Sequence, residues 1–254
     1  MTVSLFWLCK FMSSSPSNST GIFYAYAKHI KDDWSSRYLI TFATRDVADT
    51  WFRAVVDSVA TGYTRFASVK RVSPQFYTFN NDEGNIRDTI NDPKVANALN
   101  GQVFFTLLHD RDGRIISMIP VLNYRDHING ESFYIRSVAQ PDIYWYYDKS
   151  IKTIVAHPSR RSQFIVTISD WARALGTVII GSDQIFISTT TSKVNIGVKS
   201  DENQLSCSSK PFPIDFSAFG KDFQIDYWDD DDDPHSNLGP IIRSPGSGER
   251  WELV

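Results

Sequence analysis

The sequence SFYIRSV at residues 132–138, followed by IYWYY at residues 143–147, is the clearest indication of the fold class of this chain. Apolar and polar residues alternate in the first run, which is the period of a strand with one buried face. The segment Gln140–Asp142 then breaks the run, because Pro141 cannot donate a hydrogen bond to a neighbouring strand. Similar short apolar runs, separated by Gly, Pro, Asn, Asp and Ser, continue as far as residue 223. We therefore predict a compact all-β module from residue 131 to residue 223.

Two segments of this module share one layout of short strands that ends at an aromatic residue flanked by Gln and Ile. The strands are FYIR 133–136, IYW 143–145, IVA 154–156 and QFIV 163–166 in the first segment, and VII 178–180, IFI 185–187, VNIGV 194–198, LSC 205–207 and FQI 223–225 in the second. With this layout, residues 131–225 resemble the β-trefoil proteins, such as the ricin-B-type and fungal lectins. The resemblance implies a β-trefoil-like fold for residues 127–226, and it implies carbohydrate binding.

The resemblance does not transfer the sugar-contacting residues of that family. The sugar-binding trefoils carry a Gln-x-Trp signature, of which Gln163-Phe164 is only a partial match. The two segments also leave the third repeat of a trefoil unassigned, unless residues 101–124 supply a divergent one.

The N-terminal half contains the strongest helix signal, at residues 45–60. Apolar residues form one stripe at helical spacing, which is typical of a helix that covers a sheet: Val47, Ala48, Trp51, Phe52, Val55, Val56 and Val59. Thr44 is a suitable N-cap, and Asp46 lies in the first turn, where the helix dipole favours negative charge. Strands are predicted at residues 3–9, 21–27 and 37–43.

A β-hairpin is predicted between residues 102–109 and 115–122. The intervening DRDG sequence contains an Asp-Gly pair, which suits a tight reversal of the chain. Together with the preceding strands and helix, the hairpin predicts an α/β layer over residues 1–126.

The C-terminal residues differ in composition from both halves. Asp229–Asp233 is a run of like charges, and residues 240–249 are rich in Gly, Pro and Ser. The chain then becomes apolar at Arg250–Val254, where Trp251 could anchor it to a domain or to a partner. We therefore predict a β-rich α+β protein with an N-terminal α/β layer (1–126), a β-trefoil-like module (127–226), and an acidic linker with a docking tail (227–254).

Composition and charge argue against several partner classes. The net charge is −3 and the isoelectric point is about 5.9, so the phosphates of a nucleic acid would meet no basic stripe. No run approaches the roughly 20 apolar residues that a membrane-spanning helix needs. Cys9 and Cys207 are the two cysteines, which is typical of a reduced protein, and we expect a cytoplasmic location.

No catalytic, cofactor or metal motif is recognisable in the sequence. The five histidines show neither His-x-His nor i, i+4 spacing, and there is no nucleophile elbow and no glycine-rich phosphate loop. We assign no catalytic residue, no metal ligand and no cofactor. A hydrolase whose two carboxylates are distant in sequence stays open, because such a pair leaves no local pattern.

The candidate site is the aromatic cluster and its charged neighbours. We predict that it consists of Tyr144, Trp145, Tyr146, Tyr147, Asp148 and Arg136. In a strand, alternate side chains face opposite ways, so Tyr144 and Tyr146 share one face while Trp145 and Tyr147 share the other. An exposed pair beside charged groups is suited to a saccharide, with rings against C–H faces and charges on hydroxyls. The alternative is that the cluster forms an interface between the two halves of the chain.

These observations favour a non-enzymatic, lectin-like protein whose partner is a carbohydrate or a glycoprotein. The first alternative is a protein-interaction or protease-inhibitor module, because trefoil-like proteins also include inhibitors. The hydrolase is the third hypothesis. The oligomeric state is left open.

Overall fold

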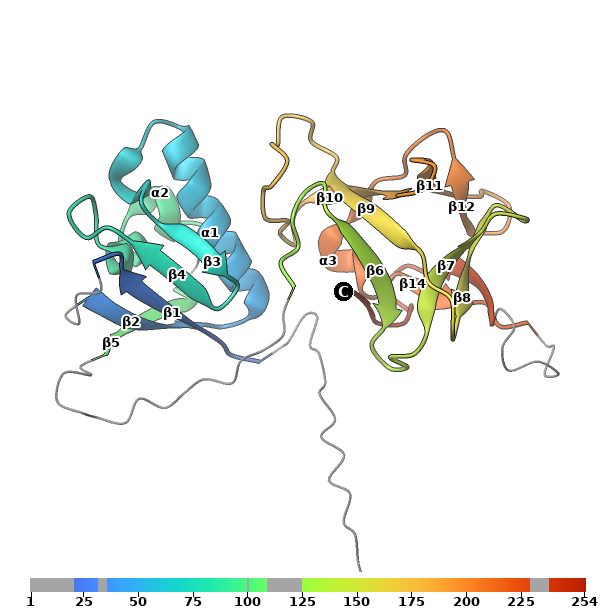
Figure 1. Cartoon of the computed structure of the whole chain (residues 1–254), viewed down its shortest axis with the longest axis horizontal. Helices are drawn as coiled ribbons and strands as arrows, with labels where there is room; N and C mark the ends of the chain where they lie inside the picture. Colours follow the sequence, from blue (N-terminus) through green and yellow to red (C-terminus); the bar gives the residue numbers. More distant parts are fainter. Residues whose placement is uncertain (1–20, 32–35, 100, 109–124, 229–237) are drawn as a thin grey trace, which may run out of the picture.

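The structure is a computed structural model that describes residues 21–31, 36–99, 101–108, 125–228 and 238–254 (Figure 1). The fold is β-rich with few helices, and its strands form two separate sheets. We call residues 21–108 the N-terminal unit and residues 125–254 the C-terminal unit. Several predicted segments lie outside the described residues: the strand at 3–9, the second strand of the hairpin at 115–122, and the aspartate run at 229–233.

The N-terminal unit contains five strands, one long helix and three short helical segments within the described residues. They are β1 (Phe23–His29), β2 (Arg37–Phe42), α1 (Arg45–Ala60), η2 (Thr64–Phe66), β3 (Lys70–Ser73), β4 (Phe76–Phe79), η3 (Ile86–Ile90), α2 (Pro93–Ala96) and β5 (Val103–Leu107). The strand order is β3-β4-β1-β2-β5, and β1 and β4 are parallel while the other pairs are antiparallel.

Helix α1 confirms the prediction made from its apolar stripe. It begins at Arg45 and ends at Ala60, and the Thr44 hydroxyl accepts a hydrogen bond from the Val47 amide at 3.2 Å. Trp51 is buried against the sheet, where its indole N–H donates to the Thr89 hydroxyl at 3.0 Å. The helix therefore covers the sheet through Ala48, Trp51 and Val55 of that stripe, whereas Val56 is 42% exposed.

The C-terminal unit contains the remaining strands and one short helix. They are β6 (Ser132–Ser137), β7 (Tyr144–Asp148), β8 (Thr153–His157), β9 (Gln163–Ile168), β10 (Gln184–Thr189), β11 (Asn195–Val198), β12 (Leu205–Ser208), β13 (Ile214–Asp215), α3 (Phe216–Phe219), β14 (Phe223–Ile225), β15 (Gly239–Arg243) and β16 (Trp251–Leu253).

The strands of the C-terminal unit close on themselves. Within the described residues, hydrogen bonding runs in the order β12-β11-β10-β9-β6-β7-β8, and a bridge between Ser206 and Thr153 returns from β8 to β12. Strand β15 pairs with β8 and β14, and β16 pairs with β6. The enclosed core takes apolar side chains from every part of this unit, from Phe133 to Leu253.

The described part of residues 101–124 does not join this closed arrangement. Val103–Leu107 forms β5 and pairs with β2 in the sheet of the N-terminal unit. The described strand of residues 101–124 therefore lies in the other sheet and supplies no third repeat to this unit.

The outer side of α1 contacts the C-terminal unit, and Figure 1 shows the helix between its own sheet and that unit. Arg53 forms an ion pair with Asp183 at 2.8 Å and donates a hydrogen bond to the Val178 carbonyl. Arg173 pairs with Asp57 at 2.6 Å. The two units are therefore joined by charged side chains that project from one helix.

A cluster of charged residues and one histidine joins the N-terminal unit to the first residues of the C-terminal unit. We call Arg45, Asp49, Arg71, Asp126 and His127 the Asp49 cluster. The Asp49 carboxylate pairs with Arg71 at 2.7 Å and with Arg45 at 2.9 Å, and Asp126 pairs with both arginines. Burial alone would raise the pKa of Asp49, but the two guanidinium groups outweigh it and hold the pKa below its usual value.

The His127 ring belongs to the same cluster and packs edge-on against Phe133 and Phe216. Burial, reinforced by the positive charge of Arg45, lowers the pKa of His127 from 6.5 to about 4. The imidazole is therefore neutral in the folded protein at neutral pH.

We predict that the protein loses stability as the pH falls from about 6.5 to about 4, because the unfolded chain binds a proton that folded His127 does not. Urea unfolding midpoints measured across this range should decrease with decreasing pH. The variant His127→Phe should show a smaller decrease, because it lacks the titrating ring. An equal pH dependence in the two proteins would contradict the assignment to His127.

Candidate functional site

The structure brings Tyr144 and Tyr146 together with one further tyrosine and two arginines. We call Tyr134, Tyr144, Tyr146, Arg160 and Arg161 the Tyr–Arg face. Tyr134 comes from β6, the other tyrosines from β7, and the arginines from the loop that joins β8 to β9. In both strands these tyrosines occupy half-exposed positions next to buried ones, so their side chains lie on the outer face of the sheet.

The rings and guanidinium groups of the Tyr–Arg face stack on one another. The Arg161 guanidinium lies 4.5 Å from the centre of the Tyr134 ring and 5.5 Å from that of Tyr144. The two rings are 6.4 Å apart and nearly perpendicular. Arg160 lies 5.8 Å from the centre of the Tyr146 ring. These distances are those of cation–π contacts, which fix the charged groups against the aromatic rings.

The loop that carries the two arginines is anchored by a buried histidine. The Nδ1 atom of His157 accepts hydrogen bonds from the backbone amides of Ser159 and Arg160, each at 3.0 Å. The His157 ring also contacts Tyr146 at 5.6 Å between ring centres. The two arginine side chains are thus exposed, while the backbone of the loop that carries them is held in place by His157.

Arg136 of the predicted site has a structural partner. Its guanidinium pairs with the carboxylate of Glu252, which is buried, and the Nε–Oε1 distance is 2.8 Å. Arg136 and Glu252 face each other in the pairing of β6 with β16. The pair therefore joins two strands that are far apart in the sequence.

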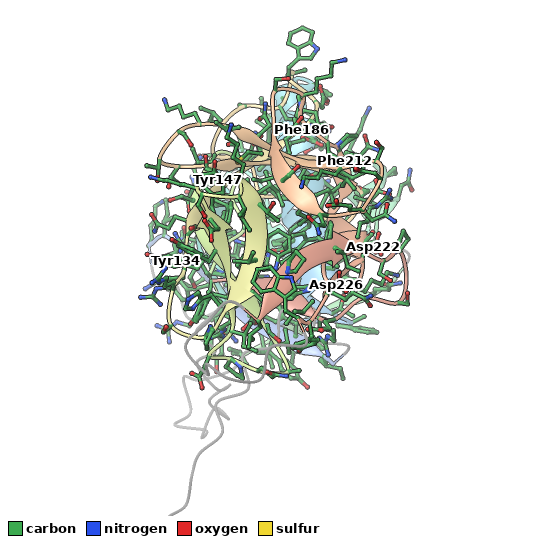
Figure 2. All side chains as sticks on the ribbon, turned by 90° about the vertical axis from the view of Figure 1, so that its right-hand side faces the viewer. Tyr134, Tyr147, Phe186, Phe212, Asp222 and Asp226 are labelled. Atoms are coloured by element: carbon green, nitrogen blue, oxygen red, sulfur yellow. The ribbon has the colours of Figure 1, made fainter. Side chains whose placement is uncertain are left out.

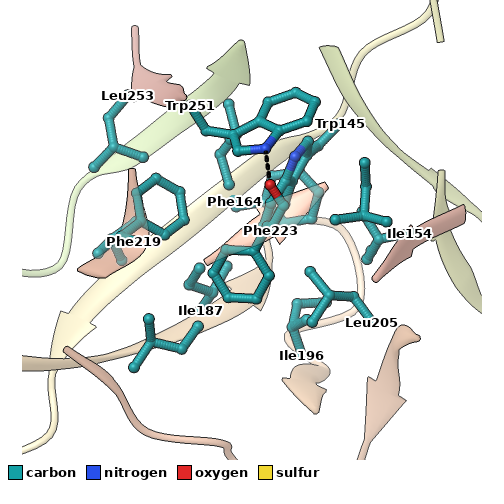
Figure 3. Close-up of a cluster of buried hydrophobic side chains, with 14 of the residues drawn as sticks. Trp145, Ile154, Phe164, Ile187, Ile196, Leu205, Phe219, Phe223, Trp251 and Leu253 are labelled. Atoms are coloured by element: carbon teal, nitrogen blue, oxygen red, sulfur yellow. Dashed lines mark hydrogen bonds between the residues drawn. The ribbon is translucent and has the colours of Figure 1, made fainter. Parts of the chain in front are cut away.

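Trp145 lies in the core and presents no face to solvent. Its exposed fraction is 0%, and its ring lies 5.5 to 6.1 Å from those of Phe223, Trp251, Phe219 and Phe164 (Figure 3). The dashed line in Figure 3 marks the hydrogen bond of 2.9 Å that the Trp251 indole donates to the Phe223 carbonyl. Within the described residues, the Trp145 indole nitrogen has no such partner.

Tyr147 and Asp148 take separate positions at the end of β7. Tyr147 packs against the core cluster, and a hydrogen bond with the Cys207 thiol, together with burial, raises the pKa of Tyr147 to about 12. The Asp148 carboxylate accepts hydrogen bonds from the Ser150 amide at 2.8 Å and from its hydroxyl at 2.6 Å. Asp148 therefore stabilises the turn between β7 and β8.

The structure also contains a cavity that the sequence did not reveal. It has a volume of about 210 Å³, and we call it the Phe212 pocket after the ring that lines it. In the view of Figure 2, Phe212 and Asp222 lie on the opposite flank of the C-terminal unit from Tyr134. Its residues come from four separate segments, so no local pattern could have indicated them.

The loop between β9 and β10 displays apolar side chains. Trp171 is 93% exposed and Leu175 is 77% exposed. The backbone of the loop is nevertheless held in place by the side chain of buried Asn129. This side chain donates hydrogen bonds to the carbonyls of Arg173 and Ala174 and accepts one from the Ile168 amide. An exposed tryptophan on an anchored loop is typical of protein interfaces, so this loop is where the protein-interaction hypothesis would apply.

Comparison of the chain with protein-family models, with curated protein sequences and with solved structures gives no match. Among the described residues, no helix combines the length and the hydropathy that crossing a membrane would require.

Proposed function

We propose that this chain binds carbohydrate without catalysing a reaction, and that its C-terminal unit is a β-trefoil. The strand pairing supports the β-trefoil, because in each of three successive segments of this unit the first strand pairs with the end of the same segment. These pairs are β6 with β9, β10 with β13, and β14 with the segment just before β16 through the Phe223–Glu249 bridge. Neighbouring segments are joined by β9–β10 and by β16–β6. A trefoil is built from three such segments.

The observation that carries the ligand proposal is the stacking of Arg161 on Tyr134 and Tyr144. Among the described carboxylates, none forms an ion pair with Arg160 or Arg161. Two guanidinium groups are thus held in place and exposed on a chain whose net charge is −3. Arginine is the side chain best suited to bind a carboxylate or a sulfate through paired hydrogen bonds.

The ligand class that fits this face is a saccharide with an acidic group. Its carboxylate or sulfate would accept hydrogen bonds from Arg161 and Arg160, while its hydroxyls would exchange hydrogen bonds with the tyrosine hydroxyls. Trp145 takes no part in this proposal, because it is buried. Of the residues predicted from the sequence, Tyr144 and Tyr146 would touch the ligand, and Arg136 would act through the strand pairing.

The proposal is tested on a glycan array that carries neutral, uronic-acid, sialylated and sulfated saccharides. We expect the full-length protein to bind acidic saccharides, and Arg161→Ala to weaken that binding about tenfold or more. A hydrogen bond to a charged group contributes about 1.5–3 kcal/mol, and each 1.4 kcal/mol is a factor of ten in Kd.

Lys149→Ala is the matched control, because it removes one positive charge from the exposed turn between β7 and β8 without touching the rings. Its binding should equal that of the unmodified protein. A silent array, or equal binding by Arg161→Ala, would overturn the proposal. Binding of an acidic peptide in place of any saccharide would instead favour the protein-interaction hypothesis.

A further inference from the structure

The Phe212 pocket lies where three strands and a loop of the C-terminal unit meet. Gln184 begins β10, Asp215 ends β13, Asp222 precedes β14, and Arg243 ends β15. Its volume of about 210 Å³ is below the roughly 300–1,000 Å³ of sites for drug-sized ligands. The pocket therefore has room for one small ring and not for an extended ligand.

Polar side chains without partners converge on this pocket. Gln184 and Asp215 face each other in the pairing of β10 with β13, and neither side chain has a hydrogen bond or an ion pair within the described residues. Asp215 is the N-cap residue of α3, yet its carboxylate does not cap that helix. Its oxygens are thus available to a ligand.

The other two polar groups are held in position. One carboxylate oxygen of Asp222 accepts a hydrogen bond from the Gly246 amide at 3.0 Å, and the Asp222 carbonyl accepts one from Ser244 at 2.7 Å. The Arg243 guanidinium lies 5.0 Å from the centre of the Phe212 ring. Among the described carboxylates, none pairs with Arg243.

The pocket thus presents acceptors and donors side by side. Two carboxylates accept, the guanidinium donates, and the Gln184 amide does both. A hydroxyl group is both donor and acceptor, so adjacent hydroxyls on one ring can satisfy a carboxylate and a guanidinium at once. A simple anion would be repelled by the two carboxylates, and the positive charge of Arg243 weakens the attraction of those carboxylates for a simple cation.

We propose that the Phe212 pocket is a second binding site, which takes a neutral, hydroxyl-rich ring such as a single monosaccharide unit. Asp215, Asp222, Gln184 and Arg243 would bind its hydroxyls, and Phe212 would contact its apolar face. The site shares a ligand class with the proposed function, but it shares no residue with the Tyr–Arg face and does not depend on it.

The test is a ligand-observed NMR titration of the full-length protein with neutral methyl glycosides of galactose, glucose, mannose and N-acetylglucosamine. We expect at least one of them to bind, and Asp215→Asn and Arg243→Met each to weaken its binding about tenfold or more. Arg243→Met keeps an apolar stem over Phe212 and removes only the donors. Thermal unfolding of each variant verifies that it is folded.

Asp226→Asn is the matched control, because Asp226 is exposed in the same unit but does not line the pocket. It should bind neutral glycosides as the unmodified protein does. Loss of acidic-saccharide binding in Arg161→Ala reports on the proposed function, whereas loss of neutral-glycoside binding in Asp215→Asn reports on this pocket. The inference is overturned if no neutral glycoside binds, if Asp215→Asn binds normally, or if glycine, a zwitterion of similar reach, binds in place of every glycoside.

Discussion

Trp145→Ala is expected to lower the free energy of unfolding of the C-terminal unit by about 3–5 kcal/mol. The Trp145 ring is fully buried and contacts four aromatic rings that come from β9, α3, β14 and β16. Removing the ring leaves a cavity, because these four elements would all have to shift to fill it. Urea unfolding followed by near-ultraviolet circular dichroism measures the loss through the shift in midpoint.

Two further variants separate burial from other effects. Trp145→Phe should cost less than Trp145→Ala, because it keeps an aromatic ring and also removes a buried N–H that has no partner among the described residues. Tyr144→Ala, on the outer face of the same strand, should cost less than either. Equal midpoints for Trp145→Ala and Tyr144→Ala would show that Trp145 is not a core residue.

Asp49→Ala is the second substitution with a large expected effect, a loss of about 3 kcal/mol from the N-terminal unit. The side chains of Asp49 and Arg71 are 6% and 4% exposed, so removing the Asp49 carboxylate takes one anionic partner from each of two buried guanidinium groups, those of Arg45 and Arg71. Far-ultraviolet circular dichroism during urea unfolding reports the effect, since α1 is the longest helix of the described residues. Asp57→Ala, which breaks the half-exposed pair with Arg173 on the same helix, should cost less than about 1 kcal/mol.

The pH dependence of stability gives a second measure of what the Asp49 carboxylate contributes to the folded state. Its pKa is lowered in the folded protein, so its contribution is present above the ordinary value of 3.8 and is lost as the pH falls towards the lower folded value. The stability difference between the unmodified protein and Asp49→Ala should therefore shrink below about pH 3.8. A difference that stays constant down to the acid limit would contradict this assignment.

The sequence predicts best where the signal is local. Helix α1 needs only its own apolar stripe and the Thr44 cap, and both its ends agree with the prediction. The alternation in β7 predicts that Tyr144 and Trp145 face opposite ways, but it does not say which of them is buried. That choice depends on Phe223 and Trp251, which lie far along the chain and reach Trp145 only through the closed strand pairing.

The candidate sites show the same limit. Tyr144 and Tyr146 could be found because aromatic residues are dense in one strand, whereas Arg161 belongs to a loop whose position depends on His157. Gln184, Asp215, Asp222 and Arg243 each look like an ordinary turn or strand residue. They form a pocket only because β13 pairs with β10 and β15 pairs with β14.

The pairing of β16 with β6 has a consequence for how the protein is made. Synthesis runs from the N-terminus, and the described strands of the N-terminal unit pair only with one another, so that unit can fold while the ribosome is still translating the rest. The pairing of β6 with β16 cannot form until Leu253 has left the ribosome, because Glu252 lies 116 residues after its partner Arg136. During that interval β6 is an open strand edge with an alternating apolar face, the feature that recruits other chains into aggregates. The nascent chain is thus most prone to aggregate between the synthesis of β6 and the emergence of β16.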